Sequence, residues 1–472
     1  MKTTQRLLTL LALAAPALSA AHAYDPVSAW RAGVPEQPAA ILVRGATLWT
    51  GGADGRLENA DLLVRRGKIA AVGAGLAAPA GALVIDGSGL HVTSGLIDAH
   101  SHTAVDGAVN EGSHISTAEV RIADVLDPDD VSIYRQLAGG LTIANVLHGS
   151  ANAIGGQNAV IKLRWGAPAA DLVFAAAPAG IKFALGENPK QSNWNPSERR
   201  FPQTRMGVQE VLRAKFQAAR DDARGWADFR ASKRRSPVPP RRDLELEALQ
   251  EILAGERLVH AHSYRADEIL MLLRVAEEYG FRLATLQHAL ESYKVADEVA
   301  RHGAGASMFS DWWGYKQEVV DAIPWAGSIT WQKGVLTSFN SDSDELARRM
   351  NLEAAKAVRY GGVPEEEALR FVTLNPARQL GIVDRVGSLE AGKDADFVLW
   401  SDHPLSTSAV CLETWIDGRK YFDRAADLAA REELAAERAA LIAKARADLD
   451  AKKKQDEAAA ADPAAAAPEV GR

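Results

Sequence analysis

Short runs of β-branched and apolar residues, separated by glycine-rich turns, fill both ends of this chain. Such runs are typical of antiparallel strands rather than helices. They are Ile41–Val43, Leu62–Val64, Ile69–Val72 and Leu83–Ile85 in the N-terminal part, and Phe397–Trp400, Val410–Ile416 and Lys420–Phe422 in the C-terminal part. Asp417-Gly418, between the last two runs, indicates a hairpin turn. We predict that residues 24–92 and 385–424 close into one small β domain.

Between the two ends, strand-like apolar runs alternate with segments of helical character. These runs are Thr142–Val146, Ala159–Leu163, Gly180–Ala184, Leu258–His262, Leu283–Gln287 and Val335–Phe339. Their alternation over residues 93–384 predicts an α/β protein with a (β/α)8 TIM-type barrel, a fold of about 250 residues. Because chemistry in this fold sits at the carboxyl ends of the strands, the polar residues just after each run are the candidate site.

Residues 1–23 combine two basic residues, an apolar run from Leu7 to Leu18 and Ala21-His22-Ala23. This is the layout of a cleavable signal peptide, and it predicts a secreted, periplasmic protein. The apolar run is shorter than the roughly 20 residues that span a membrane, so we expect no stable membrane insertion.

Two other segments depart from these strand and helix patterns. Residues 190–245 form an insertion rich in Pro, Arg and Trp, which either caps the barrel mouth or makes a solvated excursion. Residues 425–472 are dominated by Ala, Glu, Lys and Arg, and we expect an exposed helix running into a disordered end.

The 472 residues are 47% apolar and carry a formal net charge of -7, spread over stretches of mixed sign. The apolar content supports a large core, and without a basic stripe we expect no nucleic-acid partner. Cys411 is the only cysteine, which excludes an intramolecular disulfide. Stability must therefore come from the core and from any metal.

The most informative motif is Gly-Leu-Ile-Asp-Ala-His-Ser-His at residues 95–102. His100 and His102 follow a strand-like run, and residues i and i+2 of a strand point to the same side, so both imidazoles can hold one cation. Neutral imidazole nitrogen is a good ligand for zinc and similar metals. A His-x-His pair alone fits structural histidines equally well, so the other strand ends must decide.

Read in order, the strand ends supply a series of ligand-type side chains: His100, His102, Lys182, Glu187, His260, His262, His288 and Asp342. Such a series would form a hydrolytic centre with a divalent metal cofactor, zinc, as one or two ions. A carboxylate beside the activated water can take its proton and pass it to a leaving nitrogen, which is the role we expect for Asp342. Asp344 competes for this role, but its position suits the start of the next helix.

At these motifs the chain resembles the amidohydrolase superfamily, and within it the imidazolonepropionase-like metal-dependent hydrolases. The resemblance covers residues 40–424 and rests on residues 95–102, 186–190, 260–262, 340–344, 373–377 and 387–397. It implies a (β/α)8 barrel flanked by a β-sandwich built from both chain ends, in agreement with the strand pattern.

The resemblance also implies roles for individual residues. His100 and His102 match the metal ligands of the first strand, and His288 matches the ligand of the sixth strand. Asp342 matches the aspartate of the eighth strand, which in this family both binds metal and moves protons.

Two positions of the resemblance stay open. His260 and His262 both suit the fifth-strand ligand, and we favour His260, with His262 in contact with the substrate. On the fourth strand, members with two metals often use a carbamylated lysine, here Lys182, whereas others use a glutamate, here Glu187. Either would supply a negatively charged oxygen that bridges two cations about 3.5–4 Å apart.

Further substrate-binding candidates are Tyr264, Arg265 and Arg205. Their charged or hydroxyl groups would hold a substrate carboxylate through hydrogen bonds, although ordinary surface placement explains them equally well.

We therefore predict a secreted metal-dependent hydrolase that cleaves the carbon–nitrogen bond of an amide or cyclic amide. One alternative is a dipeptidase that releases residues next to proline, and a different class is a periplasmic ligand-binding barrel without turnover. Buried imidazoles and carboxylates kept without compensation would be costly, which argues against the binding protein. The insertion and the signal argue against the cytosolic imidazolonepropionase reaction. The expected partner is a small-molecule or dipeptide substrate, and a homo-oligomer is compatible with the sequence.

Overall fold

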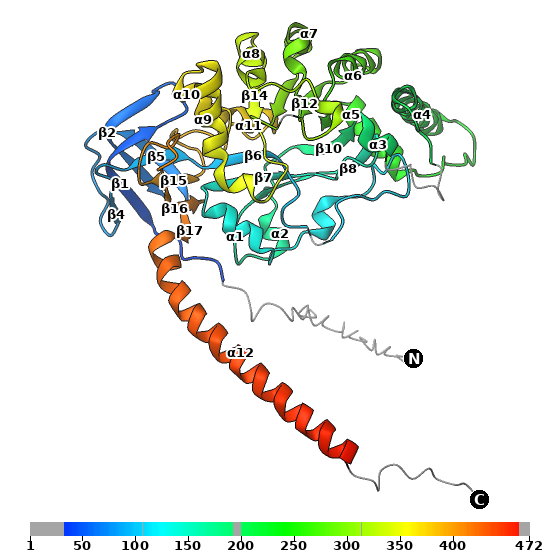
Figure 1. Cartoon of the computed structure of the whole chain (residues 1–472). Helices are drawn as coiled ribbons and strands as arrows, with labels where there is room; N and C mark the ends of the chain where they lie inside the picture. Colours follow the sequence, from blue (N-terminus) through cyan, green and yellow to red (C-terminus); the bar gives the residue numbers. More distant parts are fainter. Residues whose placement is uncertain (1–32, 106, 192–199, 313, 462–472) are drawn as a thin grey trace, which may run out of the picture.

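The computed structural model describes residues 33–105, 107–191, 200–312 and 314–461. The predicted signal peptide, residues 1–23, lies outside these ranges. Within them, no helix combines the length and the apolar character that crossing a bilayer would need. A sheet made from both chain ends stands beside a set of central strands with surrounding helices (Figure 1).

The end sheet contains β1 Ala40–Trp49, β2 Arg56–Arg65, β3 Lys68–Gly73, β4 Leu83–Asp86, β5 His91–Ser94, β15 Phe397–Trp400, β16 Cys411–Ile416 and β17 Arg419–Asp423. Its order is β17-β16-β15-β5-β1-β2-β3, with β4 paired to β1. The long β1 pairs with β4 at its start and with β5 at its end, and β5 continues to β15. The described strands of the two chain ends thus join in one eight-stranded sheet.

The central strands form two sheets. One contains β6 Leu96–Ser101, β7 Leu141–Val146 and β9 Ala159–Lys162, and the other contains β8 Ile154–Gln157, β10 Ala179–Ala184, β11 Arg257–His262, β12 Leu283–Gln287, β13 Gly305–Met308 and β14 Thr337–Phe339. β10 to β14 run parallel, as do β6 and β7.

β8 and β9 depart from the regular barrel that the sequence predicts. β9 pairs antiparallel with β7, and β8 pairs antiparallel with β10. Only Asn158 separates the two strands, so no helix lies between them. Among the described residues, no hydrogen-bonded ladder joins the two sheets into one closed ring.

Helices surround these sheets (Figure 1). They are α1 Val131–Leu137, α2 Ala169–Leu172, α3 Glu187–Gln191, α4 Arg205–Ala231, α5 Leu244–Leu253, α6 Ala266–Tyr279, α7 Ala296–His302, α8 Ala326–Gln332, α9 Met350–Gly361, α10 Glu365–Arg370, α11 Leu374–Gln379 and α12 Arg424–Ala461, with 3-10 turns η2 Ile122–Val125, η3 Ser292–Lys294, η4 Gln317–Val319 and η5 Leu346–Arg349. α6 buries Ile269, Leu272, Leu273 and Ala276, the spacing of one apolar helix face. α4 and the start of α5 come from the insertion, and α12 projects away from the rest of the protein.

A buried charge cluster joins the end sheet to the central strands. Lys162, at the end of β9, is fully buried, and its Nζ lies 2.9 Å from Asp394, 2.9 Å from Asp396 and 2.6 Å from Asp417. Burial lowers the pKa of Lys162, but the three aspartates raise it by more, so the amine stays charged. One side chain from the central strands thus ties together three carboxylates from the C-terminal part.

Candidate metal centre

His100 and His102 stand at the end of β6 with their rings at 89° and their ring centroids 5.2 Å apart. His100 is fully buried, whereas His102 is partly exposed. His102 Nδ1 lies 2.9 Å from the carbonyl oxygen of Leu147. Because a carbonyl only accepts hydrogen bonds, Nδ1 carries the proton, and Nε2 is left as the ligand atom.

Asp342 brings a carboxylate to the same point from beyond β14. Its backbone is left-handed, with φ 47°, and its N–H donates to the carbonyl of His100 at 3.1 Å. Asp342 Oδ1 lies 3.1 Å from His102 Nε2 and 3.5 Å from His100 Nε2. The candidate ligand atoms of these three residues all lie within 4.8 Å of one another. One cation with bonds of about 2.0–2.2 Å fits between ligand atoms at this spacing.

The charge states of these groups suit a cation. Burial alone would raise the pKa of Asp342, but His288 and His102 outweigh it and hold that pKa at about 2. Burial, reinforced by Lys182, lowers the pKa of His100 well below its usual range. Burial likewise lowers the pKa of His288 to about 3. At neutral pH the site therefore offers His100 and His288 as neutral imidazoles and Asp342 as an ionised carboxylate, the forms that bind metals.

Asp98 fixes the end of β6 against the segment that follows β14. Its Oδ1 accepts the backbone N–H groups of His100 and Ser341, each at 3.1 Å, and its Oδ2 accepts the Ser341 hydroxyl. Burial raises the pKa of Asp98 to about 6, although these bonds oppose the rise. Neither Asp98 nor Ser341 is among the residues predicted for the site. The sequence does indicate such a role for Asp98, because a carboxylate inside the apolar run before His100 needs buried hydrogen-bond partners.

β11 and β12 contribute two more buried imidazoles. His288 has φ 55°, its ring centroid lies 4.1 Å from that of His100, and its Nε2 is 3.6 Å from Asp342 Oδ2. The ring centroid of His262 lies 5.1 Å from that of His288. In the described part of the chain, neither nitrogen of His262 or of His288 has a hydrogen-bond partner.

His260 differs from His262 although both are buried on β11. His260 Nδ1 lies 3.3 Å from the hydroxyl of Thr285, the residue opposite it on β12. Burial, then the charge of Lys182, lowers the pKa of His260 to about 4. The Thr285 hydroxyl is thus a hydrogen-bond partner of Nδ1, and Nε2 is the nitrogen of His260 left for a metal.

The two candidates for the fourth-strand ligand, Lys182 and Glu187, have different surroundings. Lys182 is fully buried in β10, with Nζ 3.4 Å from His100 Nε2 and 3.2 Å from the carbonyl of His148. Burial lowers its pKa to about 8. Glu187 begins α3 and pairs with Lys316 at 3.5 Å, and the side chains of both are partly exposed. Lys182, rather than Glu187, is therefore the candidate that lies against the first-strand histidines.

Tyr264 packs against the histidines of the site. Its ring centroid lies 4.3 Å from that of His262, and its hydroxyl is 2.6 Å from the hydroxyl of Tyr315. The ammonium of Lys316 lies 4.4 Å from the Tyr264 ring. These groups bring a cation and two hydroxyls to the same side of the site as His262.

The two predicted arginines already have carboxylate partners. Arg265 pairs with Asp267 at 2.9 Å and is 42% exposed, which is a surface ion pair. Arg205 pairs with Glu318 at 2.8 Å and with Glu268 at 3.3 Å, and both glutamates are buried. A substrate carboxylate would have to displace these protein carboxylates from either arginine.

The donor set tests whether a metal fits this site. His100 Nδ1 and all four nitrogens of His262 and His288 are buried without a hydrogen-bond partner among the described residues. Buried polar atoms without partners cost about 1–3 kcal/mol each. A divalent metal would satisfy one nitrogen of each imidazole that binds it, so the residues present fit a metal.

This chain is similar to known amidohydrolases. The model of the amidohydrolase family matches residues 328–426. An amidohydrolase from Hapsidospora irregularis is 32% identical over 427 residues, which make up 81% of this chain and 43% of that protein. An imidazolonepropionase from Erwinia tasmaniensis is 52% identical over 58 residues, 12% of this chain and 13% of its own length. The chain thus spans less than half the length of these curated relatives.

A solved structure matches over its full length. The crystal structure of an amidohydrolase from Thermotoga maritima is similar with a TM-score of 0.75 and 33% sequence identity, covering 81% of this chain and 100% of that chain. This likeness supports a TIM-barrel-type fold with an additional domain, which is the coarse form of the predicted architecture.

Proposed function

We infer the function of this chain from its family, because it belongs to the amidohydrolase superfamily, in the imidazolonepropionase-like branch. We propose that it hydrolyses the carbon–nitrogen bond of an amide or cyclic amide at a metal centre built on His100, His102 and Asp342. The observation that carries this proposal is the convergence of three ligand atoms within 4.8 Å, beside buried imidazoles that have no other partner.

The ligand set extends from these three residues to the neighbouring strands. His288 would complete it together with a histidine of β11. His262 has two nitrogens without partners, whereas in His260 the bond from Nδ1 to Thr285 leaves Nε2 for a metal, as the bond to Leu147 does in His102, so both stay candidates. Lys182 would supply the fourth-strand ligand, because it is buried against His100 whereas Glu187 is paired elsewhere. When bound, the metal, which we propose to be zinc, supplies Lewis-acid chemistry: it polarises a carbonyl and lowers the pKa of water.

Asp342 would move the proton of the reaction. With a pKa of about 2, its carboxylate is ionised at neutral pH and can accept a proton from the attacking water. The same oxygen can then donate that proton to the leaving nitrogen. The hydrogen bond from its backbone to His100 keeps the carboxylate in place through both transfers.

Tyr264 and Lys316 would face the substrate beside His262. A tyrosine hydroxyl and an ammonium suit a substrate with a carboxylate near the scissile bond, such as an N-acyl amino acid or a dipeptide. Peptides ending in proline belong to this class and test the dipeptidase alternative. Arg205 and Arg265 would contribute less, because protein carboxylates hold them at 2.8 and 2.9 Å, whereas the carboxylate nearest to the Lys316 ammonium, that of Glu187, is 3.5 Å away.

We also propose that the reaction takes place in the periplasm, because residues 1–23 have the layout of a signal peptide. Expression of the full chain followed by N-terminal sequencing of the periplasmic fraction tests it. A mature terminus near Tyr24 is expected, and recovery of the intact terminus from the cytoplasm would contradict it.

Turnover by the Asp342→Asn variant tests the chemistry. Metal-loaded protein is screened on N-acyl amino acids, dipeptides with and without proline, and cyclic amides. On the best substrate we expect Asp342→Asn to retain most of its metal but to lose at least about a hundredfold in kcat, the scale of general acid-base effects. Asp344→Asn, two residues along the same loop, is the matched control and should keep its rate.

Two outcomes would contradict the proposal. Unchanged turnover in Asp342→Asn would remove Asp342 from the mechanism. Metal-loaded protein that binds members of the panel but hydrolyses none of them would favour the ligand-binding barrel.

A further inference from the structure

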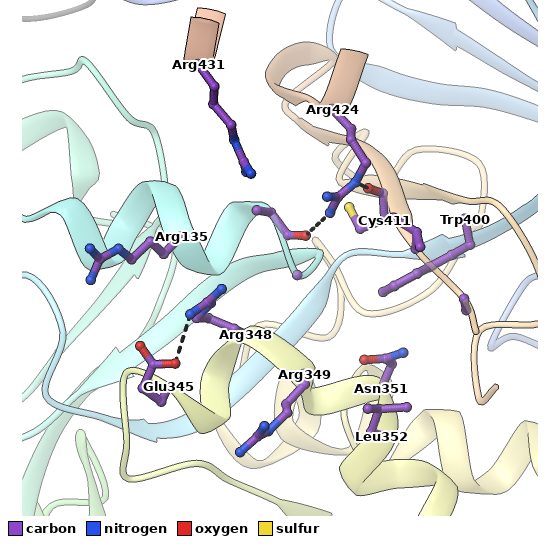
Figure 2. A pocket seen from close by; sticks show the side chains of 14 residues that line it. Arg135, Glu345, Arg348, Arg349, Asn351, Leu352, Trp400, Cys411, Arg424 and Arg431 are labelled. Atoms are coloured by element: carbon purple, nitrogen blue, oxygen red, sulfur yellow. Dashed lines mark hydrogen bonds and ion pairs between the residues drawn. The ribbon is translucent and has the colours of Figure 1, made fainter. Parts of the chain in front are cut away.

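A cavity of about 420 Å³ lies where the base of α12 meets α1, the start of α9 and β16 (Figure 2). None of its lining residues belongs to the candidate metal centre. Its wall includes five arginines, namely Arg135, Arg348, Arg349, Arg424 and Arg431. The only acidic residue of the lining is Glu345. The whole chain carries a net charge of -7, so this positive charge is a local feature and not a reflection of composition.

Most of this positive charge is not neutralised within the cavity wall. Arg424 donates hydrogen bonds to two neutral carbonyls, those of Cys411 at 2.6 Å and Ala138 at 3.3 Å. In the parts of the chain that the structure describes, Arg135 and Arg349 form neither an ion pair nor a side-chain hydrogen bond. Three guanidinium groups therefore lack a carboxylate partner.

The other two arginines have carboxylate partners. Arg348 pairs with Glu345 at 2.8 Å, and Arg431 pairs with Asp427 at 2.7 Å. Both side chains of the first pair are exposed, 45% for Arg348 and 67% for Glu345, so this pair is weak and a stronger anion can compete for Arg348. Asp427 is only 13% exposed, but Arg431 itself is 63% exposed and keeps part of its guanidinium open to a further anion. Figure 2 shows the two side chains entering from different walls, Arg431 from α12 and Arg348 from the segment before α9.

We propose that this cavity binds a small organic anion that carries a phosphate group. Guanidinium groups present several N–H donors in one plane and bind phosphate oxygens with two hydrogen bonds at once. The volume falls within the range of about 300–1,000 Å³ that is usual for small-molecule sites. Leu352 and Val410 line the cavity beside the arginines and give the organic part of the ligand an apolar contact.

Binding of glycerol 2-phosphate, followed by phosphorus NMR, tests the proposal on the full-length, metal-loaded protein. Glycerol is the uncharged comparison, and the salt is kept near 0.01 M, where the Debye length is about 30 Å. We expect saturable binding of the phosphate and none of glycerol. The double variant Arg348→Gln/Arg431→Gln should weaken binding at least about tenfold, because it removes two charged hydrogen-bonding groups.

The matched control removes two arginines elsewhere on the surface. Arg224 and Arg242 are 71% and 70% exposed, and each pairs with a carboxylate close to it in sequence, as Arg348 does. Arg224→Gln/Arg242→Gln should bind glycerol 2-phosphate as the wild type does. Equal weakening in both double variants would show that only the net charge matters and would overturn the proposal, as would the absence of saturable binding in the wild type.

A crystal soaked in sodium tungstate locates the anion without any variant. Anomalous density between Arg348, Arg424 and Arg431 is expected. Density at the metal centre alone would overturn the proposal, because the phosphate would then be a ligand of that centre.

Discussion

Lys162 and Lys182 are both fully buried, yet their surroundings are opposite. Lys162 has three aspartate partners within 2.9 Å, and its pKa is raised. The Nζ of Lys182 has an imidazole nitrogen at 3.4 Å and a carbonyl at 3.2 Å, and burial lowers its pKa to about 8. The difference separates two surroundings of a buried lysine: Lys162 joins two parts of the fold, whereas Lys182 has no carboxylate within ion-pair distance in the described residues and is our proposed fourth-strand metal ligand.

The surroundings of each lysine extend this contrast. Around Lys162, Arg164 contacts Asp417, while Lys68 and Arg385 contact Asp394, so cations and carboxylates alternate. Around Lys182 the neighbours are imidazoles with unsatisfied nitrogens. Where buried cations and carboxylates pair with one another, no bound ligand is required. Buried ligand atoms without hydrogen-bond partners would instead be satisfied by a metal.

The largest effect is expected from Lys162→Met, which leaves three aspartates without their shared partner. We expect the free energy of unfolding to fall by about 3–5 kcal/mol, the cost of breaking a buried ion pair from one side. Urea denaturation of the metal-loaded protein measures it. Lys333→Met is the control, because Lys333 is 51% exposed and pairs only with the exposed Asp297, so it should cost about 0–1 kcal/mol. Similar losses in the two variants would contradict the structural role of Lys162.

Lys182→Met should change how stability depends on pH. The folded pKa of Lys182, about 8, lies below the ordinary value of 10.5. Its contribution to stability is therefore fully present above pH 10.5 and is lost as the pH falls through 8, because a charged amine is then buried. On chelator-treated protein we expect Lys182→Met to be more stable than the wild type at pH 7, by up to about 3 kcal/mol.

This advantage of Lys182→Met should shrink as the pH rises towards 10. Urea denaturation at pH 7, 8.5 and 9.5 follows the trend. A gap between variant and wild type that stays constant over this range would mean that Lys182 does not titrate there.

A smaller effect is expected from Ser341→Ala, which removes one hydrogen bond to Asp98. We expect a loss of about 1–2 kcal/mol in stability and a fall in metal affinity of about tenfold, because Asp98 orients the backbone of His100. Ser310→Ala is the matched control, since it removes a buried serine-to-carboxylate bond to Glu353. Equal metal affinity in the two variants would separate Asp98 from the metal centre.

Local patterns predicted most strands of the fold. The β-branched runs at Ile41–Val43 and Leu62–Val64 lie within β1 and β2, and the Asp417-Gly418 turn is confirmed between β16 and β17. The period-2 argument for the His-x-His motif also holds, because both imidazoles reach the same carboxylate. These features depend on neighbours in sequence, which is why a single chain reveals them.

Features that depend on distant partners could not be predicted. Lys162 lies near the end of a predicted strand, and the three aspartates that pair with it follow more than two hundred residues later. His260 and His262 share one side of β11, so their sequence positions do not distinguish them. Their hydrogen bonds do: Thr285 on the next strand is a partner of His260 Nδ1, and His262 has none among the described residues. The antiparallel β8 is not among the predicted strands, because its pairing with β10 decides its structure.

Metal content per chain tests the central claim most directly. Elemental mass spectrometry of mature protein, purified without chelator, should find one or two equivalents of zinc or a similar divalent metal. The metal should be lost in His100→Ala/His102→Ala and kept in His403→Ala, whose imidazole pairs with Glu365 away from the centre. Absence of metal in the wild type, even after reconstitution, would contradict the account and make the buried histidines structural.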